Sequence, residues 1–77
     1  MEQLLDILRE LHPGTDFEKE TRLVDDGILA SFDIVMLITR IEEEFDVVIP
    51  AKDIVPKYFN SADALYALIK RIAEQDD

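Results

Sequence analysis

The stretch DDGILASFDIV, residues 25–35, places one serine, Ser31, where a glycine-containing loop passes into an apolar helical pattern. From Ser31 to Phe45 the apolar residues recur at the spacing of one helix face. The predicted buried stripe consists of Ile34, Ile38, Ile41 and Phe45, with Val35 and Leu37 on its shoulders. This pattern predicts an amphipathic helix that begins at Ser31 and packs the stripe into the core.

The chain before this helix predicts a first helix and then a long loop. Residues 2–11 carry Leu4, Leu5, Leu8 and Leu11 at helical spacing, and His12, Pro13 and Gly14 end the pattern. Residues 15–30 show no sustained period and contain a glycine, which indicates an ordered loop. A loop of this length in a small domain is usually functional. Its apolar residues are expected to reach the core: Phe17, Leu23, Val24, Ile28 and Leu29.

The chain after this helix predicts a connection, a short helical segment and a last helix. Residues 46–50 are expected to form an extended connection, and residues 51–60, with Pro56 and an aromatic pair, one or two helical turns. Asn60 or Ser61 is expected to cap the last helix, and residues 74–77 are expected to fray. The buried stripe of the last helix is predicted to be Leu65, Leu68, Ile69 and Ile72.

These elements predict an all-α fold, a small bundle of three main helices plus a short fourth helix, with a long loop between the first two. The chain has 77 residues, which is enough for one domain, residues 1–77, with a single small core. The apolar runs are short, and the N-terminus lacks the basic start of a signal peptide. We therefore expect a soluble, cytoplasmic protein that is a monomer and does not insert into membranes.

The charge of the chain indicates the kind of partner. Eighteen acidic residues against eight basic ones give a formal net charge of −10, which disfavours binding to nucleic acid. Basic protein surfaces are the expected partners, although the acidity also serves solubility.

Enzymatic and metal-binding functions find little support in the residues. The chain has no cysteine, so a thiol nucleophile is excluded, and His12 is the only histidine, which leaves no metal-ligand cluster. His12 is expected to contact exposed carbonyls at the end of the first helix rather than serve as a catalytic base. We predict no metal site and no enzyme activity.

The residues around Ser31 predict a docking face. Ser31 alone would be an ordinary N-cap, but Phe32 and Met36 lie four residues apart on the polar side of its helix. Packing of these two side chains beneath the loop or the short helix is the alternative. Acidic residues follow toward the helix end, where negative charge is unfavourable. The predicted partner-binding residues are Phe32, Met36, Arg40, Glu42, Glu43, Glu44 and Asp46.

The sequence LVDDGILASFDIVMLITRIEEEFDVVIP, residues 23–50, resembles the signature of acyl carrier proteins and of the related peptidyl and D-alanyl carrier domains. The resemblance also covers the first helix and FNSADALYALIKRI, residues 59–72. It implies that a phosphopantetheinyl transferase attaches phosphopantetheine from coenzyme A to Ser31. The prosthetic thiol would hold an acyl or aminoacyl group as a thioester, in fatty acid, polyketide or nonribosomal peptide biosynthesis. The second helix would recognise loading and transferring enzymes through their arginines and lysines.

One departure from the family pattern leaves two hypotheses open. The family normally has Asp-Ser-Leu at the attachment point, whereas this chain has Ala30, Ser31 and Phe32. We hypothesise that Ala30 slows or prevents loading, because the aspartate helps the transferase engage the serine and its metal ion. The first hypothesis is a freestanding carrier, and the aromatic segment VPKYFNS, residues 55–61, favours aminoacyl or specialised acyl cargo. The second is an unmodified adaptor with the carrier fold that binds a basic partner.

Overall fold

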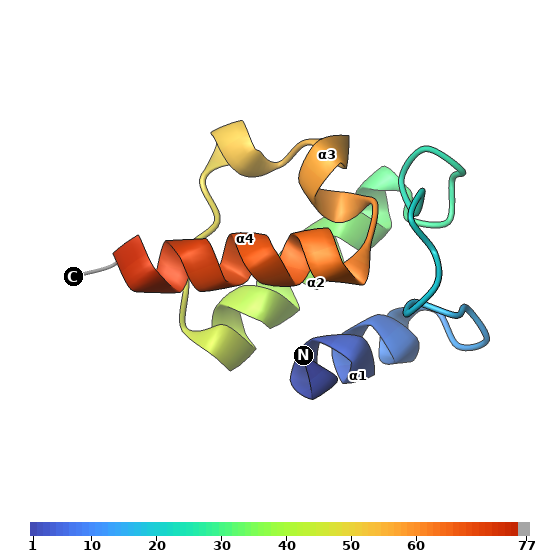
Figure 1. The fold of residues 1–77 in the computed structure, drawn as a ribbon, viewed down its shortest axis with the longest axis horizontal. Helices are drawn as coiled ribbons and strands as arrows, with labels where there is room; N and C mark the ends of the chain where they lie inside the picture. Colours follow the sequence, from blue (N-terminus) through green and yellow to red (C-terminus); the bar gives the residue numbers. More distant parts are fainter. Residues whose placement is uncertain (76–77) are drawn as a thin grey trace.

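The computed structural model describes residues 1–75 of the chain (Figure 1). Its regular elements are four α-helices and one 3₁₀ turn, joined by loops. Within these residues there is no strand, and no helix has the length and apolar character needed to cross a membrane. The all-α bundle with three long helices and a short fourth is therefore confirmed. Its elements are α1 (Glu2–Leu11), α2 (Ser31–Phe45), η1 (Ala51–Asp53), α3 (Pro56–Phe59) and α4 (Ala62–Gln75).

The core lies where the three long helices meet. Helix α1 packs against both α2 and α4, and the short α3 packs against α4. Each long helix contributes buried leucine or isoleucine side chains, and burial of one such side chain is worth about 1.5–3 kcal/mol. The fully buried side chains from these helices include Leu4, Leu8, Leu37, Ile41, Leu65 and Leu68.

The buried face of α2 differs from the predicted one. Leu37 and Ile41 form its centre, and Ile34, Ile38 and Phe45 are half-buried against the core. Val35, predicted as a shoulder of the stripe, is 61% exposed. Residues two positions apart stand about 200° apart around a helix, so Leu37 and Val35 cannot both face the core.

The long loop before α2 packs into the core as predicted. Phe17, Leu23 and Leu29 are buried, and Val24 and Ile28 are half-buried against the core. Gly27 adopts a φ of +77°, which L side chains rarely adopt.

Asn60, which follows α3, holds this loop in place through hydrogen bonds. Its side-chain oxygen accepts hydrogen bonds from the backbone N–H groups of Val24, at 2.9 Å, and Asp25, at 3.0 Å. Its backbone carbonyl accepts the N–H of Leu23 at 2.9 Å, and its amide nitrogen donates to the Asp25 carboxylate. These four bonds fix the path of the loop just before the start of α2. Asn60 is therefore occupied with the loop, and Ser61 caps α4 by accepting the N–H of Ala64 at 3.0 Å.

The connection after α2 is extended, as predicted. Asp46 ends α2 in the left-handed conformation, with φ 55° and ψ 48°. Val47 and Ile49 are buried, whereas Val48 between them is exposed. At the other end of the chain, α4 continues to Gln75, farther than the expected start of fraying at residue 74. The rest of the tail expected to fray, residues 76–77, lies outside the described residues.

Candidate functional site

Ser31 is the first residue of α2, and its side chain is exposed. The N-cap is Ala30, with φ −88° and ψ 173°, so the predicted start of the helix at Ser31 is confirmed and the alternative of Ser31 as an ordinary N-cap is excluded. The cause is Asp33, whose carboxylate accepts the backbone N–H of Ala30 at 3.1 Å and fixes Ala30 at the boundary. Ser31 is therefore not needed as a cap.

Asp33 also ties the start of α2 to the end of α1. Its Oδ2 atom lies 3.0 Å from Nε2 of His12, although the ring N–H is not aligned for a hydrogen bond. His12 is the C-cap of α1, and its backbone N–H donates to the carbonyl of Leu8 at 2.9 Å, so the expected contact with a helix-end carbonyl is made by the backbone, whereas the side chain contacts Asp33. The hydrogen bond from Ala30 lowers the pKa of Asp33 below its ordinary value, and the contact with His12 adds to this shift.

The backbone N–H groups of the first turn of α2 are free to bind an anion. The first helical hydrogen bond runs from the N–H of Ile34 to the carbonyl of Ala30, at 3.0 Å. Within residues 1–75, the N–H groups of Ser31, Phe32 and Asp33 and the Ser31 hydroxyl have no hydrogen-bond partner. Free N–H groups at the positive end of a helix dipole favour phosphate groups. An exposed hydroxyl beside them fits a phosphodiester attached to Ser31.

Three exposed apolar residues follow Ser31 along α2. Phe32 is 72% exposed, Val35 61% and Met36 41%. The predicted exposure of Phe32 and Met36 is confirmed, and packing beneath the loop is excluded for both. Val35 extends the surface and was missed because its own hydrophobicity had placed it in the core. We refer to Phe32, Val35 and Met36 as the apolar patch of α2.

Some of the predicted acidic residues of α2 are exposed to solvent, and others hydrogen-bond within the protein. Glu43 and Asp46 are exposed near the end of α2. Glu42 instead accepts the backbone N–H of Ile49 at 3.1 Å, and so anchors the connection after α2. Glu42 therefore makes a contact within the fold, whereas Glu43 and Asp46 are exposed to solvent.

Arg40 and Glu44 are turned toward α1. Arg40 pairs with Glu10 at 2.7 Å, and the same carboxylate raises the pKa of the guanidinium. The Glu44 carboxylate accepts a hydrogen bond from the amide of Gln3 at 3.1 Å. These contacts hold α1 against α2, which gives both residues a role within the fold.

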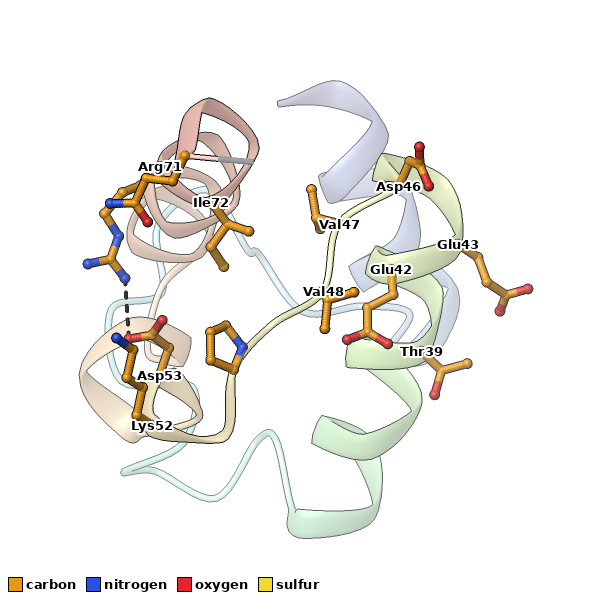
Figure 2. Close-up of a pocket in the computed structure, with 12 residues that line it drawn as sticks. Thr39, Glu42, Glu43, Asp46, Val47, Val48, Lys52, Asp53, Arg71 and Ile72 are labelled. Carbon is orange, nitrogen blue, oxygen red and sulfur yellow. Dashed lines mark ion pairs between the residues drawn. The ribbon is translucent and has the colours of Figure 1, made fainter. Parts of the chain in front are cut away.

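An open groove of about 680 Å³ lies between the C-terminal half of α2, residues 46–53 and the end of α4 (Figure 2). Glu42, Glu43 and Asp46 line it on the α2 side. On the opposite side Asp53, whose side chain is 11% exposed, pairs with Arg71 at 3.3 Å. Residues 1–75 contain no group of three potential metal ligands. Charged and apolar residues line the groove, and local sequence patterns do not predict it because its walls come from separate segments of the chain.

Comparison with known proteins identifies two relatives, although no family model matches the chain. Both are from Bradyrhizobium diazoefficiens, and they are named aminoacyl carrier protein 2 and aminoacyl carrier protein 1. Each is 36% identical to this chain over 63 residues, which is 82% of the chain. The matched region covers 70% of the first relative and 69% of the second.

Proposed function

The chain belongs to the acyl carrier protein family, and we propose that it carries an aminoacyl group as a thioester on phosphopantetheine attached to Ser31. The observation that carries this proposal is the exposed Ser31 side chain at the first position of α2, beside three free N–H groups. The family assigns the chain a carrier role, and the attachment site and the cargo are the proposed additions.

The first turn of α2 suits the attachment chemistry. In the transfer, the Ser31 oxygen forms a new bond to the phosphorus that carries pantetheine in coenzyme A, and the bond from that phosphorus to the bridging oxygen breaks. The serine proton is lost, and adenosine 3′,5′-bisphosphate leaves. The free N–H groups would then stabilise the phosphodiester by about 0.3–1 kcal/mol. The thiol of the prosthetic group supplies the thioester bond to the cargo.

Two observations favour an aminoacyl cargo. Both relatives are named for aminoacyl groups. In addition, six charged residues line the groove along α2 together with Val47, Val48, Pro50 and Ile72, and such a mixed wall is less favourable for a long hydrocarbon chain than an apolar one. A short cargo with a charged amine is compatible with these walls.

Partner enzymes would dock on the exposed side of α2. The apolar patch lies next to Ser31, and Glu43 and Asp46 lie farther along the helix. An apolar centre supplies most of the binding energy, and charges at its edge steer a basic partner into register. The proposed partners are a phosphopantetheinyl transferase and enzymes that load or accept the aminoacyl group, in the cytoplasm where coenzyme A is present.

A second candidate function rests on Ala30. Ala30, the N-cap of α2, stands where the family normally has an aspartate. The resemblance implies that the carboxylate of this aspartate takes part in loading. If loading fails for this reason, the same exposed face would serve an unmodified adaptor for a basic protein.

Intact-mass spectrometry distinguishes the two functions. The purified chain is incubated with coenzyme A and a broad-specificity phosphopantetheinyl transferase, together with Ser31→Ala and Ala30→Asp. A carrier gains the mass of one phosphopantetheine, and Ser31→Ala gains none. If neither the wild type nor Ala30→Asp gains mass, the adaptor is favoured.

A further inference from the structure

The basic residues are distributed unevenly over the molecule. In residues 1–50 every basic side chain pairs with a carboxylate, at distances from 2.7 Å for Arg40 to 3.9 Å for Lys19. The four remaining basic residues are Lys52, Lys57, Lys70 and Arg71. Within residues 1–75 only Arg71 of these four has an ion-pair partner. An otherwise acidic chain therefore presents uncompensated positive charge around η1, α3 and α4.

A pocket of about 280 Å³ opens among these residues. Its surface is mostly apolar, and two cations lie at its edge. The Lys57 ammonium and the Arg71 guanidinium each lie 5.4 Å from the centre of the Tyr58 ring, which places both charges beside an aromatic wall. The lining residues are Lys57, Tyr58, Ala64, Ala67, Leu68 and Arg71.

This pocket lies apart from the exposed face of α2. Figure 2 shows Arg71 and α2 on opposite sides of the groove. Lys57 and Tyr58 belong to α3, which packs against α4, so a partner bound in the pocket would contact α3 and α4.

We propose that this pocket is a second docking surface, which binds an acidic peptide segment of a partner protein and takes one of its apolar side chains between α3 and α4. The volume suits one anchoring side chain, and such anchors dominate protein interfaces. Lys57, which has no ion-pair partner within residues 1–75, attracts carboxylates that flank the anchor, and Arg71, paired with Asp53, lines the pocket beside it. The net charge of the whole chain opposes an acidic partner, but salt screens charges that lie more than about 8–10 Å away, so the local bases dominate. A second copy of this chain is disfavoured because both copies carry the full charge of −10.

The test is an NMR titration of the ¹⁵N-labelled full chain with a synthetic peptide, acetyl-Glu-Glu-Leu-Glu-Glu-amide, at an ionic strength of about 0.15 M, where the distant charges of the chain are screened. We expect amide shifts concentrated in α3 and the first half of α4. Lys57→Glu should weaken binding about fivefold, whereas the matched control Lys19→Glu, which changes the net charge equally in the distant loop, should change it by less than about twofold. A peptide with serine in place of leucine should bind more weakly than the parent peptide.

Several outcomes would overturn the proposal. Equal weakening by Lys57→Glu and Lys19→Glu would mean a general charge effect, and shifts centred on α2 would place the peptide elsewhere. If the leucine and serine peptides bound equally well, no apolar side chain of the peptide would be anchored in the pocket. If amide shifts appeared in the pocket when the chain alone was concentrated, the occupant would be a second copy of the chain.

Ala67→Glu, at an exposed position of the pocket, provides a second variant that tests peptide binding beside Lys57→Glu. Loading at Ser31 should be unchanged in both variants, so failure here is distinct from failure of the carrier function.

Discussion

The carboxylate of Asp33 accepts a hydrogen bond from the backbone N–H of Ala30 at 3.1 Å, and so closes the first turn of α2 around Ser31. In a complete capping box, the residue at position 30 would also accept an N–H group of this turn. Alanine has no acceptor, so the chain has one half of the capping box and lacks the other. The alanine that departs from the family pattern therefore leaves the N–H groups of the first turn without a side-chain acceptor.

Replacement of Ala30 should separate the effect of capping from the effect of charge. Ala30→Asn and Ala30→Asp should each raise the free energy of unfolding by about 1 kcal/mol, because both side chains can cap the first turn. Thermal unfolding should show this as a rise in Tm of about 4–8 °C. Ala30→Asp alone should also speed the attachment of phosphopantetheine, measured as the initial rate of mass gain.

Ala30→Asn is the matched control for the loading rate, because it supplies the cap without the carboxylate. Equal acceleration by both variants would mean that loading responds to helix stability. Equal rates for the wild type and Ala30→Asp would remove the hypothesis that Ala30 slows loading.

The lowered pKa of Asp33 predicts a dependence of stability on pH. A carboxyl group whose pKa is lower in the folded chain stabilises the fold above its unfolded pKa, and this contribution is lost as the pH falls through the folded pKa. At neutral pH we expect Asp33→Asn to lower the free energy of unfolding by about 0.5 kcal/mol. The difference from the wild type should shrink as the pH falls below 3.8, the ordinary value for this group.

Urea unfolding at a series of pH values measures this difference. Asp63→Asn, which changes an exposed acid in the first turn of α4, is the control. A difference for Asp33→Asn that stays constant down to the lowest pH would show that the charge of Asp33 is not its source.

Asn60 should control the stability of the loop before α2. Asn60→Ala removes the acceptor of two backbone N–H groups and is expected to destabilise the fold by about 1–3 kcal/mol. Hydrogen exchange at the Val24 and Asp25 amides should become faster than in the wild type.

Ser61→Ala is the comparison for Asn60→Ala, because it removes the cap of α4 and leaves the loop contacts in place. It should cost about 1 kcal/mol without selective loss of protection in the loop. Identical exchange patterns in the two variants would contradict the role assigned to Asn60.

The different contacts of neighbouring glutamates predict different effects on docking. Glu43 is exposed on the groove side of α2, whereas Glu44 bonds to Gln3 of α1. Glu43→Lys should raise the KM of the transferase for the carrier about fivefold at low salt, and high salt should reduce this effect. Glu44→Lys should raise the KM less and lower the Tm more. A larger KM effect for Glu44→Lys would show that partners dock on the α1 side.

Periodicity along the chain was sufficient to predict the helices. In α1 and α4 the apolar residues form one clear stripe opposite charged residues, so Leu4, Leu8, Leu65 and Leu68 were assigned to the core correctly. The loop residues that reach the core were also correct, because an apolar side chain in a small domain has few other places to be buried.

Features set by neighbouring helices could not be predicted from local pattern. Leu37 and Val35 stand about 200° apart on α2, so only one of them can face the core, and the packing of α1 against α2 selects Leu37. The bonds of Asn60 to the loop, and of Arg40 to Glu10, join residues far apart in the sequence. The predicted helix Ser31–Phe45 matches α2, whereas the bond of the Asp33 carboxylate to the Ala30 N–H at its start was not predicted.

Localisation of the attached group tests the central claim most directly. After incubation with coenzyme A and the transferase, digestion with trypsin gives the peptide of residues 23–40, between Arg22 and Arg40, in which Ser31 is the only serine. Tandem mass spectrometry should find the phosphopantetheine on this peptide, at Ser31. A peptide that stays unmodified, while a known carrier in the same tube is loaded, would contradict the account.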